Sequence, residues 1–186
     1  SASSSGIKTT CPTTVEDSYF AKIGMRQVSS SDQAEAIFAS STVEEINITN
    51  CLFDSCGKDG DYNSVLLIRS PNTNIQNCKF NFTDHDSACK PAYVKCCCNL
   101  LFFNNTITKS RSKGALHYQP DNKNNKEIEN IIIKQNIFEN CAGVNSRAMY
   151  IELATNNFIF SNNTITDCPE YSYILNFQLP DTYETF

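Results

Sequence analysis

The stretch SNNTITDC, residues 161–168, has near copies at four other places in the chain, which read FNNTITKS, KQNIFENC, QNCKFNFT and TNCLFDSC. Each copy has one apolar residue that serves as an origin for alignment. These origins are spaced 27, 27, 31 and 27 residues apart and are Phe53, Phe80, Ile107, Phe138 and Ile165. A period of this length is typical of solenoids, in which each copy forms one coil.

Apolar residues alternate with polar ones ahead of each origin. Five residues before it stand Ile48, Ile75, Phe102, Ile133 and Phe160, and seven before it stand Ile46, Thr73, Leu100, Ile131 and Phe158. This two-residue alternation indicates a strand with one buried face. Each period has room for two more strands, and one of these columns consists of SVLLIRS, AYVKCCC, GALHYQP, AMYIELA and YILNFQL.

Asparagine columns mark the two ends of the first strand. Eight residues before the origin stand Asn72, Asn99, Asn130 and Asn157, and two before it stand Cys51, Cys78, Asn105, Asn136 and Asn163. Asn tolerates left-handed backbone angles, and its amide bonds both to local backbone and to the same amide in the next coil. We therefore expect the first residue of each Asn pair to face outward and the second inward, so that Asn105, Asn136 and Asn163 form a buried column.

Three strands per coil predict an all-β fold, a right-handed parallel β-helix of about six coils of about 27 residues each. The β-helix domain is expected over residues 33–186. Residues 1–32 are expected to form an N-terminal arm and a short capping helix, because TTVEDSYFAKIGM places Val15, Tyr19, Phe20 and Ile23 near helical spacing. The polar segment DNKNNKEIE lies within the longest period and is expected to loop out of the stack.

Two copies carry a further short motif. Phe102-Phe103-Asn104-Asn105 and Phe160-Ser161-Asn162-Asn163 fit an F-x-x-N pattern, and KGALHY and SRAMYI look like altered forms of a G-G-A-I motif that follows it. In these residues the chain resembles the polymorphic membrane protein repeats of chlamydiae and related trichomonad surface proteins, over roughly residues 44–179. The resemblance implies a right-handed β-helix used for display and adhesion. The glycine pair of G-G-A-I is intact in neither copy.

The amino-acid composition limits which partners the protein is expected to bind and in which compartment it is expected to lie. The 186 residues include 15 basic and 20 acidic residues without long runs, for a net charge of -5, which argues against nucleic acid and anionic membranes. No stretch is apolar for long enough to insert directly into a bilayer. Ten cysteines favour an oxidising compartment, outside the cell or on its surface. Four N-x-Ser/Thr glycosylation candidates point the same way: Asn47, Asn81, Asn104 and Asn162.

The cysteines are interpreted as disulfides or buried thiols rather than as ligands of a metal site. Cys141 and Cys168 fall three residues after their origins in adjacent coils, so a disulfide is expected between them. Cys51 and Cys78 stack at the inward corner position, where they are either bridged or buried thiols. The run CCC lacks the paired spacing of zinc ligands, so no metal and no cofactor are expected.

Catalytic residues are not expected. Enzymes that cleave polysaccharides need paired carboxylates, or a base beside a cation, on one strand face. The corresponding strands offer Arg69, Lys95, His117 and Glu152, one per coil, and no two carboxylates stack. Asp84 to Asp86 are interpreted as a polar loop. A polysaccharide lyase or hydrolase is therefore the weakest of three functional hypotheses.

One outward column is apolar in three successive coils, where it consists of Leu101, Ile132 and Ile159, with Phe103 at the next outward position. Such a patch marks a contact surface unless another segment covers it. The favoured hypothesis is a non-enzymatic extracellular or cell-surface module that mediates adhesion or interaction, with a protein or glycan as partner. The alternative is a structural protein whose copies assemble end to end into a filament or coat.

Overall fold

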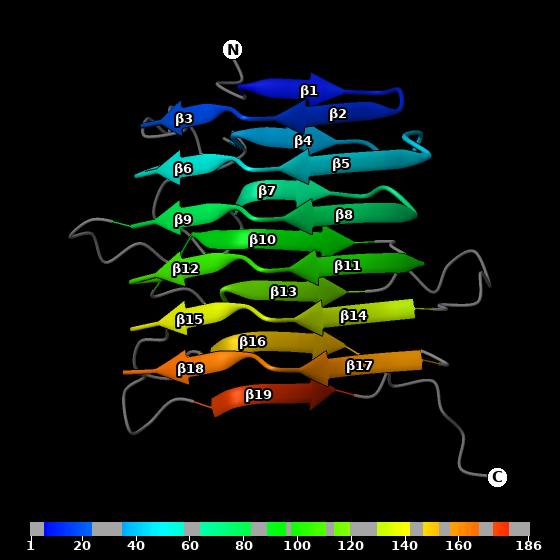
Figure 1. Cartoon of the computed structure of the whole chain (residues 1–186). Coiled ribbons are helices and arrows are strands. Elements are labelled where there is room, and N and C mark those ends of the chain that lie inside the picture. The colour runs from blue at the N-terminus through cyan, green and yellow to red at the C-terminus, as the bar shows by residue number, and fades with distance from the viewer. Residues whose placement is uncertain are drawn as a thin grey trace, which may run out of the picture.

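A computed structural model describes residues 6–23, 35–57, 64–82, 89–95, 98–110, 114–119, 130–141, 147–152, 157–167 and 173–178. Within them the chain forms an all-β parallel β-helix, as the sequence predicts. The strands run through three parallel sheets in turn, which we call A, B and C (Figure 1). Sheet A has seven strands, and sheets B and C have six each.

The strands of each sheet follow the order of the coils. Sheet A contains β1 (Ile7–Thr9), β4 (Ile37–Ala39), β7 (Ser64–Ile68), β10 (Lys90–Lys95), β13 (Leu116–Gln119), β16 (Arg147–Glu152) and β19 (Tyr173–Gln178). Sheet B contains β2 (Thr13–Glu16), β5 (Glu45–Thr49), β8 (Asn72–Gln76), β11 (Asn99–Phe103), β14 (Asn130–Lys134) and β17 (Asn157–Ser161). Sheet C contains β3 (Tyr19–Ala21), β6 (Leu52–Asp54), β9 (Lys79–Asn81), β12 (Thr106–Thr108), β15 (Ile137–Glu139) and β18 (Thr164–Thr166).

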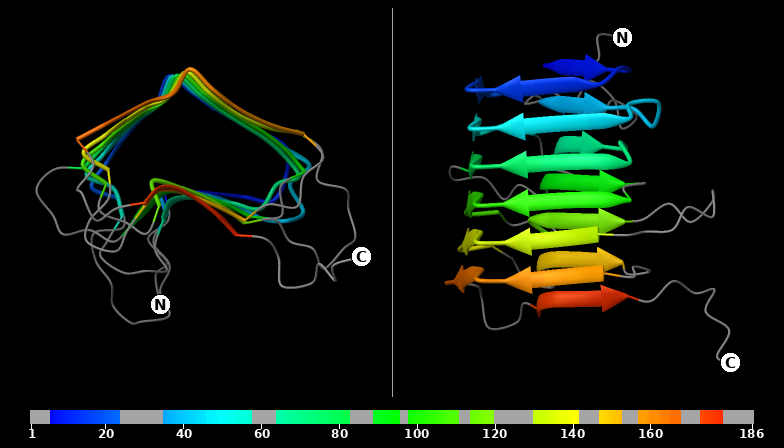
Figure 2. Two further views of the ribbon diagram at one scale, coloured as in Figure 1. Left: turned by 90° about the horizontal axis from the view of Figure 1, so that it is seen from below. Right: turned by 45° about the vertical axis from the view of Figure 1, so that its right-hand side comes forward.

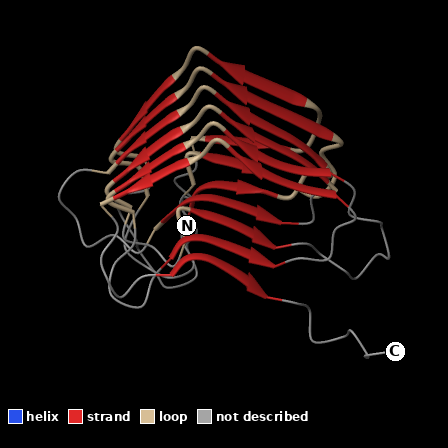
Figure 3. Cartoon of the chain, turned by 60° about the horizontal axis from the view of Figure 1, so that its bottom comes forward, coloured by secondary structure: helices blue, strands red, loops and turns tan. Residues whose placement is uncertain are grey.

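A two-residue corner joins sheet B to sheet C in every coil. Seen along the stack, these corners superimpose, and sheet A closes the third side of the cross-section (Figures 2 and 3). The first corner residue has a positive φ of 49 to 58° and is Asp17, Asn50, Asn77, Asn104, Gln135 or Asn162. Asn and Asp tolerate this left-handed conformation better than most residues, which explains why an asparagine so often occupies the position.

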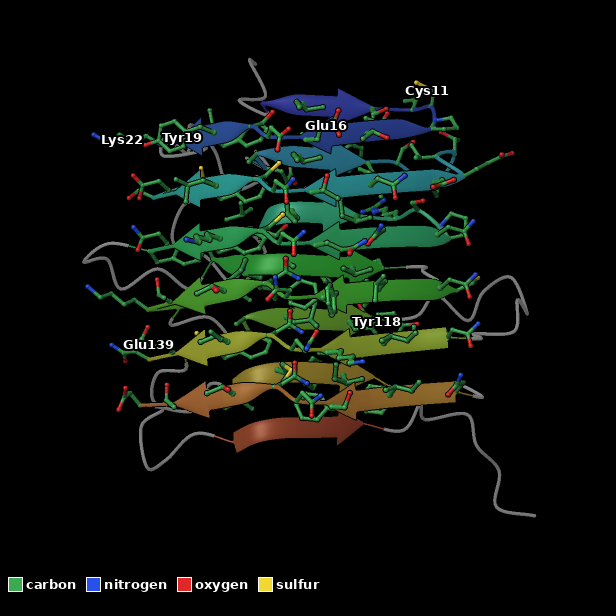
Figure 4. All side chains as sticks on the ribbon, viewed as in Figure 1. Cys11, Glu16, Tyr19, Lys22, Tyr118 and Glu139 are labelled. Atoms are coloured by element: carbon green, nitrogen blue, oxygen red, sulfur yellow. The ribbon has the colours of Figure 1, made fainter. Side chains whose placement is uncertain are left out.

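The core consists of the inward residues of all three sheets. Phe53, Phe80, Phe102 and Phe138 are all buried. The rings of Phe20 and Phe53, and those of Phe53 and Phe80, stack with centroids 4.9 Å apart. This spacing is close to the distance between neighbouring strands, about 4.8 Å, so equivalent side chains lie directly above one another (Figure 4).

The expected N-terminal helix is wrong, because the described part of the chain contains no helix and residues 13–16 and 19–21 form β2 and β3. Val15 pairs with Ile48, and Phe20 pairs with Phe53, so this segment is another copy of the repeat. A strand followed by a two-residue corner produces an apolar spacing that resembles that of a helix. Strand β1, from the expected arm, pairs with β4. The polar segment 121–129 lies outside the described residues.

The inward asparagine column is confirmed, and its members form a hydrogen-bonded ladder. Asn105 Nδ2 donates to Ile75 O at 2.9 Å and to Asn136 Oδ1 at 3.2 Å, while its backbone N–H donates to Asn136 Oδ1 at 2.8 Å. Asn136 repeats this pattern with Phe102 O and Asn163 Oδ1, each at 2.9 Å. Asn105 and Asn136 are fully buried. The ladder thus satisfies donors that would otherwise be buried without partners.

Thiols replace the amides in the earlier coils. Cys78 Sγ donates to Ile48 O at 3.5 Å and Cys51 Sγ to Val15 O at 3.6 Å, and these carbonyls are equivalent to the acceptors of the Asn amides. Both thiols are free, so the disulfide considered between them is not formed. A hydrogen bond from Cys78 lowers the pKa of Cys51 to about 7, whereas the same contact and burial raise the pKa of Cys78.

The expected bridge between Cys141 and Cys168 is also not formed, because Cys141 carries a free thiol. Its Sγ donates to Ile107 O, a carbonyl of the preceding coil, at 3.3 Å. Cys56 makes the equivalent bond to Phe20 O at 3.3 Å. The buried thiols therefore act as weak donors between coils. Cys168 lies outside the described residues.

Candidate interaction faces

The outer face of sheet B changes character along the stack. Its central outward column places Asn47 beside Asn74, Asn74 beside Leu101, Leu101 beside Ile132, and Ile132 beside Ile159. Leu101 and Ile132 are half-buried, and Ile159 is 40% exposed. The apolar column predicted from the sequence therefore exists on this face. We call Leu101, Ile132 and Ile159 the apolar stripe.

A shallow groove of about 420 Å³ lies where the amide part of this column meets the apolar stripe. Its lining combines amides, one carboxylate and apolar side chains: Glu45, Asn47, Asn72, Thr73, Asn74, Asn99, Leu100, Leu101, Asn130 and Ile132. Within it Asn74 Nδ2 donates to Asn47 Oδ1 at 3.2 Å, but Asn74 Oδ1 is buried without a hydrogen-bond partner. The groove thus contains an acceptor that the chain itself does not use.

One rim of the groove is an amide ladder at the start of the sheet B strands. Asn99 Nδ2 donates to Asn72 Oδ1 at 2.8 Å, Asn130 to Asn99 at 3.2 Å, and Asn157 to Asn130 at 2.9 Å. Side-chain amides bound to each other in series are held in one orientation. The groove therefore has a rigid polar rim beside an apolar floor. Phe103, the fourth residue predicted for this surface, lies half-buried at the next outward position.

The four glycosylation candidates differ in how available their amides are. Asn162 and Asn104 are exposed at the B–C corner, as expected, and Asn81 is exposed on sheet C. Asn104 Nδ2 donates to Asn77 Oδ1 at 2.8 Å, so this amide is engaged. Asn47 is only half-buried rather than fully exposed, and its Nδ2 donates to Glu45 at 2.8 Å. Asn81 Nδ2 donates to Asp54 at 3.3 Å, so among the described residues Asn162 is the candidate whose amide is not engaged in a hydrogen bond.

The outer face of sheet A contains the residues weighed as catalytic candidates. Val94 pairs with Ile68 and Lys95 with Gln119, which places Arg69, Lys95 and Gln119 in one column. The equivalent residue of the column in β16 is Glu152. His117 is not part of it, because it pairs with Tyr93 and Tyr150 in the neighbouring column. Its ring stacks on that of Tyr93 at 4.4 Å and meets that of Tyr150 edge-on at 4.6 Å.

Two features are absent from the described residues. No three His, Cys, Asp or Glu side chains come together there as a metal site would require. No helix of that part is long and apolar enough to cross a bilayer. The segments of Asp84 to Asp86 and of Cys96 and Cys97 lie outside the described residues.

Comparison with known proteins adds no relative. No protein-family model matches the chain, and searches of curated proteins and of solved structures found no match. The fold alone therefore defines the class of the protein, which is a parallel β-helix solenoid.

Proposed function

We propose that the chain is an extracellular or cell-surface β-helix module that mediates adhesion or interaction, and that the outer face of sheet B is where it binds a partner protein. One observation carries the proposal. The central outward column changes from asparagine to Leu101, Ile132 and Ile159 within a single continuous sheet. The fold does not require this change, because the coils with Asn47 and Asn74 form the same strands without it.

The composition of this surface fits a protein partner. Protein interfaces have an apolar centre and a polar rim, with about one hydrogen bond for every 100 to 200 Å². The apolar stripe supplies such a centre, and the amide ladder from Asn72 to Asn157 supplies a rim.

The extracellular part of the proposal depends on the sequons and on motif resemblance. Asn162 and Asn104 present sequons at exposed corners. The F-x-x-N motifs, whose second Asn joins the inward ladder at Asn105 and Asn163, support kinship with the chlamydial and trichomonad surface repeats. Because the described cysteines are free thiols, the cysteine count adds nothing to this argument.

A pair of substitutions tests the sheet B surface. Leu101→Asn with Ile132→Asn continues the amide column of Asn47 and Asn74 and removes the apolar stripe. The matched control, Leu52→Asn with Ile137→Asn, removes two exposed apolar residues from sheet C, where they are 38% and 43% exposed. We expect saturable binding to members of an array of extracellular protein domains by the wild type and the control, and loss of that binding in the stripe variant. Equal binding by both variants, or no binding by the wild type, contradicts the proposal.

Self-assembly is a second candidate, supported by the ends of the stack. Among the described strands, β17 and β18 pair on one side only, as do β2 and β3 at the other end. At one end Ile159 and Phe160 are 40% and 36% exposed, and at the other Tyr19 is 63% exposed. Open strand edges of matching register are able to pair between copies. Filaments in electron microscopy, with light scattering that grows with concentration, support this function, whereas a monomer at all concentrations excludes it.

A further inference from the structure

Three cationic side chains gather on the outer face of sheet A, away from the surface proposed for a protein partner. Lys8 belongs to β1, Arg69 follows β7, and Lys95 ends β10. Lys8 is exposed, and Arg69 and Lys95 are half-buried. The chain as a whole has a net charge of -5, so this cluster has the opposite sign to the average surface.

Aromatic rings hold these cations in place. Lys8 Nζ lies 5.6 Å and the Arg69 guanidinium 5.9 Å from the centre of the Phe38 ring. Lys95 Nζ lies 4.9 Å from the centre of the Tyr93 ring. The Tyr93 hydroxyl in turn donates to Gln119 Oε1. A cation already placed against a ring loses less conformational freedom when it binds an anion than a free side chain does.

Arg69 and Lys95 stand side by side at an unfavourable position. Because Val94 pairs with Ile68, the two residues that follow are neighbours on adjacent strands, about 4.8 Å apart at the backbone. Like charges placed directly opposite one another destabilise a sheet. In addition, Arg69 Nε is buried and donates to no acceptor. Both features are unfavourable in the isolated chain, and an anion bound between the two charged groups relieves their mutual repulsion.

Among the described residues, the positions next to this pair in the column contain no acid. Ser40 precedes Arg69, since Ala39 pairs with Ile68, and Gln119 follows Lys95. Glu152 occupies the next coil, beyond Gln119. Among the described residues Lys8, Arg69 and Lys95 have cation–π contacts, but none of them forms an ion pair. The cluster is therefore an uncompensated positive surface.

From these observations we propose that the outer face of sheet A binds a linear anionic polysaccharide, through Lys8, Arg69 and Lys95. The cations are spread along the stacking direction over the coils from β1 to β10. A linear polymer that carries a carboxylate or sulfate on each sugar presents its charges in a similar row. Charge-assisted hydrogen bonds from Arg69 and Lys95 would then replace their mutual repulsion. This site is independent of the protein-binding surface proposed on sheet B.

The aromatic rings argue for a glycan rather than a nucleic acid. Proteins that bind single strands stack bases on free aromatic faces. Here the faces of Phe38 and Tyr93 are in contact with cations, and Tyr93 also stacks on His117. The overall acidic charge also disfavours nucleic acid. The available contacts are charges, which suit the carboxylate or sulfate groups of a glycan.

The test measures binding of the full chain to heparin and to polygalacturonate by titration calorimetry over a series of salt concentrations. The site variant is Arg69→Gln with Lys95→Gln, and the matched control is Lys79→Gln with Lys134→Gln, which removes the same charge from sheets C and B. We expect at least one of the two polymers to bind the wild type and the control, more weakly as salt increases. The site variant should bind it at least about tenfold more weakly.

Three results overturn the proposal: no binding of either polymer to the wild type, equal loss in the site and control variants, or equally tight binding of a single-stranded DNA of the same length. Lys95→Glu gives a second readout that does not depend on an intact fold of the double variant. It places an acid beside Arg69, so we expect a higher melting temperature in low salt together with weaker glycan binding. A lower melting temperature would mean that Lys95 has a purely structural role.

Discussion

In the coils that contain β5 and β8, the inward corner residue is a cysteine and the central outward residue of sheet B is an asparagine. In the coils that contain β11, β14 and β17 the two are exchanged, with asparagine inside and Leu101, Ile132 or Ile159 outside. The backbone does not change between the two regions, because sheets B and C run through both. The inward corner position therefore requires only a donor for one carbonyl of the preceding coil. The fold does not restrict the central outward residue of sheet B in the same way.

We expect the interior amides to stabilise the fold more than the thiols do, because an amide oxygen is a stronger acceptor than a sulfur. Asn105 Oδ1 accepts the backbone N–H of Cys78 at 2.9 Å. A cysteine at the same place offers only a sulfur, a weak acceptor, to which the backbone N–H of Cys51 is directed. The four predictions that follow test this difference between the two regions, in order of decreasing effect.

Removing one amide from the ladder should have the largest effect. Asn136→Leu leaves the buried N–H of Asn105 without its acceptor and should lower the free energy of unfolding by about 1 to 3 kcal/mol. Asn136→Cys keeps a donor for Phe102 O, as Cys78 does for Ile48 O, and should cost less. Urea unfolding of the two variants checks both values. Equal stability of Asn136→Leu and the wild type would show that the ladder contributes nothing.

Extending the ladder in the other direction should stabilise the fold. In Cys78→Asn the new Oδ1 would accept the N–H of Cys51, and the new Nδ2 would keep the bond to Ile48 O. We expect a gain of about 1 kcal/mol in the free energy of unfolding, measured by the same urea titration. Cys141→Asn, at a buried thiol outside the ladder, is the control and should not stabilise. A loss of stability in Cys78→Asn would show that the core of the earlier coils accommodates a thiol at this position better than an amide.

The paired thiols should make the stability of the earlier coils depend on pH. The pKa of Cys51 is lowered from 9.0 to about 7 by its hydrogen bond from Cys78. A folded-state pKa below the unfolded value stabilises the fold at high pH, so the free energy of unfolding should rise as the pH increases from 7 to 9. Above that range the raised pKa of Cys78 acts in the opposite direction. Unfolding measured under reducing conditions should show the rise in the wild type and not in Cys51→Ala.

The smallest effect is expected on the outer face. Leu101→Asn would place an amide beside Asn74, whose Oδ1 is buried without a partner. The gain of that bond offsets the loss of a half-buried leucine, so stability should change by less than about 0.5 kcal/mol. Thermal unfolding checks this value. A large loss would mean that the apolar stripe is needed for folding and would remove the argument that it exists for binding.

The sequence predicts the coils well where the corner carries asparagine. In these five coils, the alignment on Phe53, Phe80, Ile107, Phe138 and Ile165 places the inward residues of sheets B and C correctly, because the two-residue corner keeps the strands in constant register. The repeat pattern does not reveal the first coil, because Asp17 and Ser18 replace the Asn pair and Phe20 is 33 residues from Phe53. The pairing of Val15 and Phe20 at a separation of five was the available signal.

The sheet A site was harder to predict. The segments that lead into and out of sheet A differ in length between coils, so sequence position does not determine register there. The sequence alone therefore predicts His117 in the same column as Arg69 and Lys95, whereas in the structure it pairs with Tyr93 in the neighbouring column. The two candidate disulfides are wrong for another reason. A buried cysteine of one coil donates, as a thiol, to a carbonyl of the preceding coil, as Cys141 does to Ile107 O.

The rate of hydrogen exchange at asparagine side chains tests most directly which asparagines lie inside the coils and which lie on the outer face. In an NMR measurement on the intact chain, the Nδ2 protons of Asn105 and Asn136 should exchange only as fast as the whole fold opens, because both residues are fully buried and hydrogen-bonded. The Nδ2 protons of Asn47, on the outer face, should exchange far faster. Rapid exchange at Asn105 and Asn136, or protection of Asn47 equal to theirs, would contradict the account.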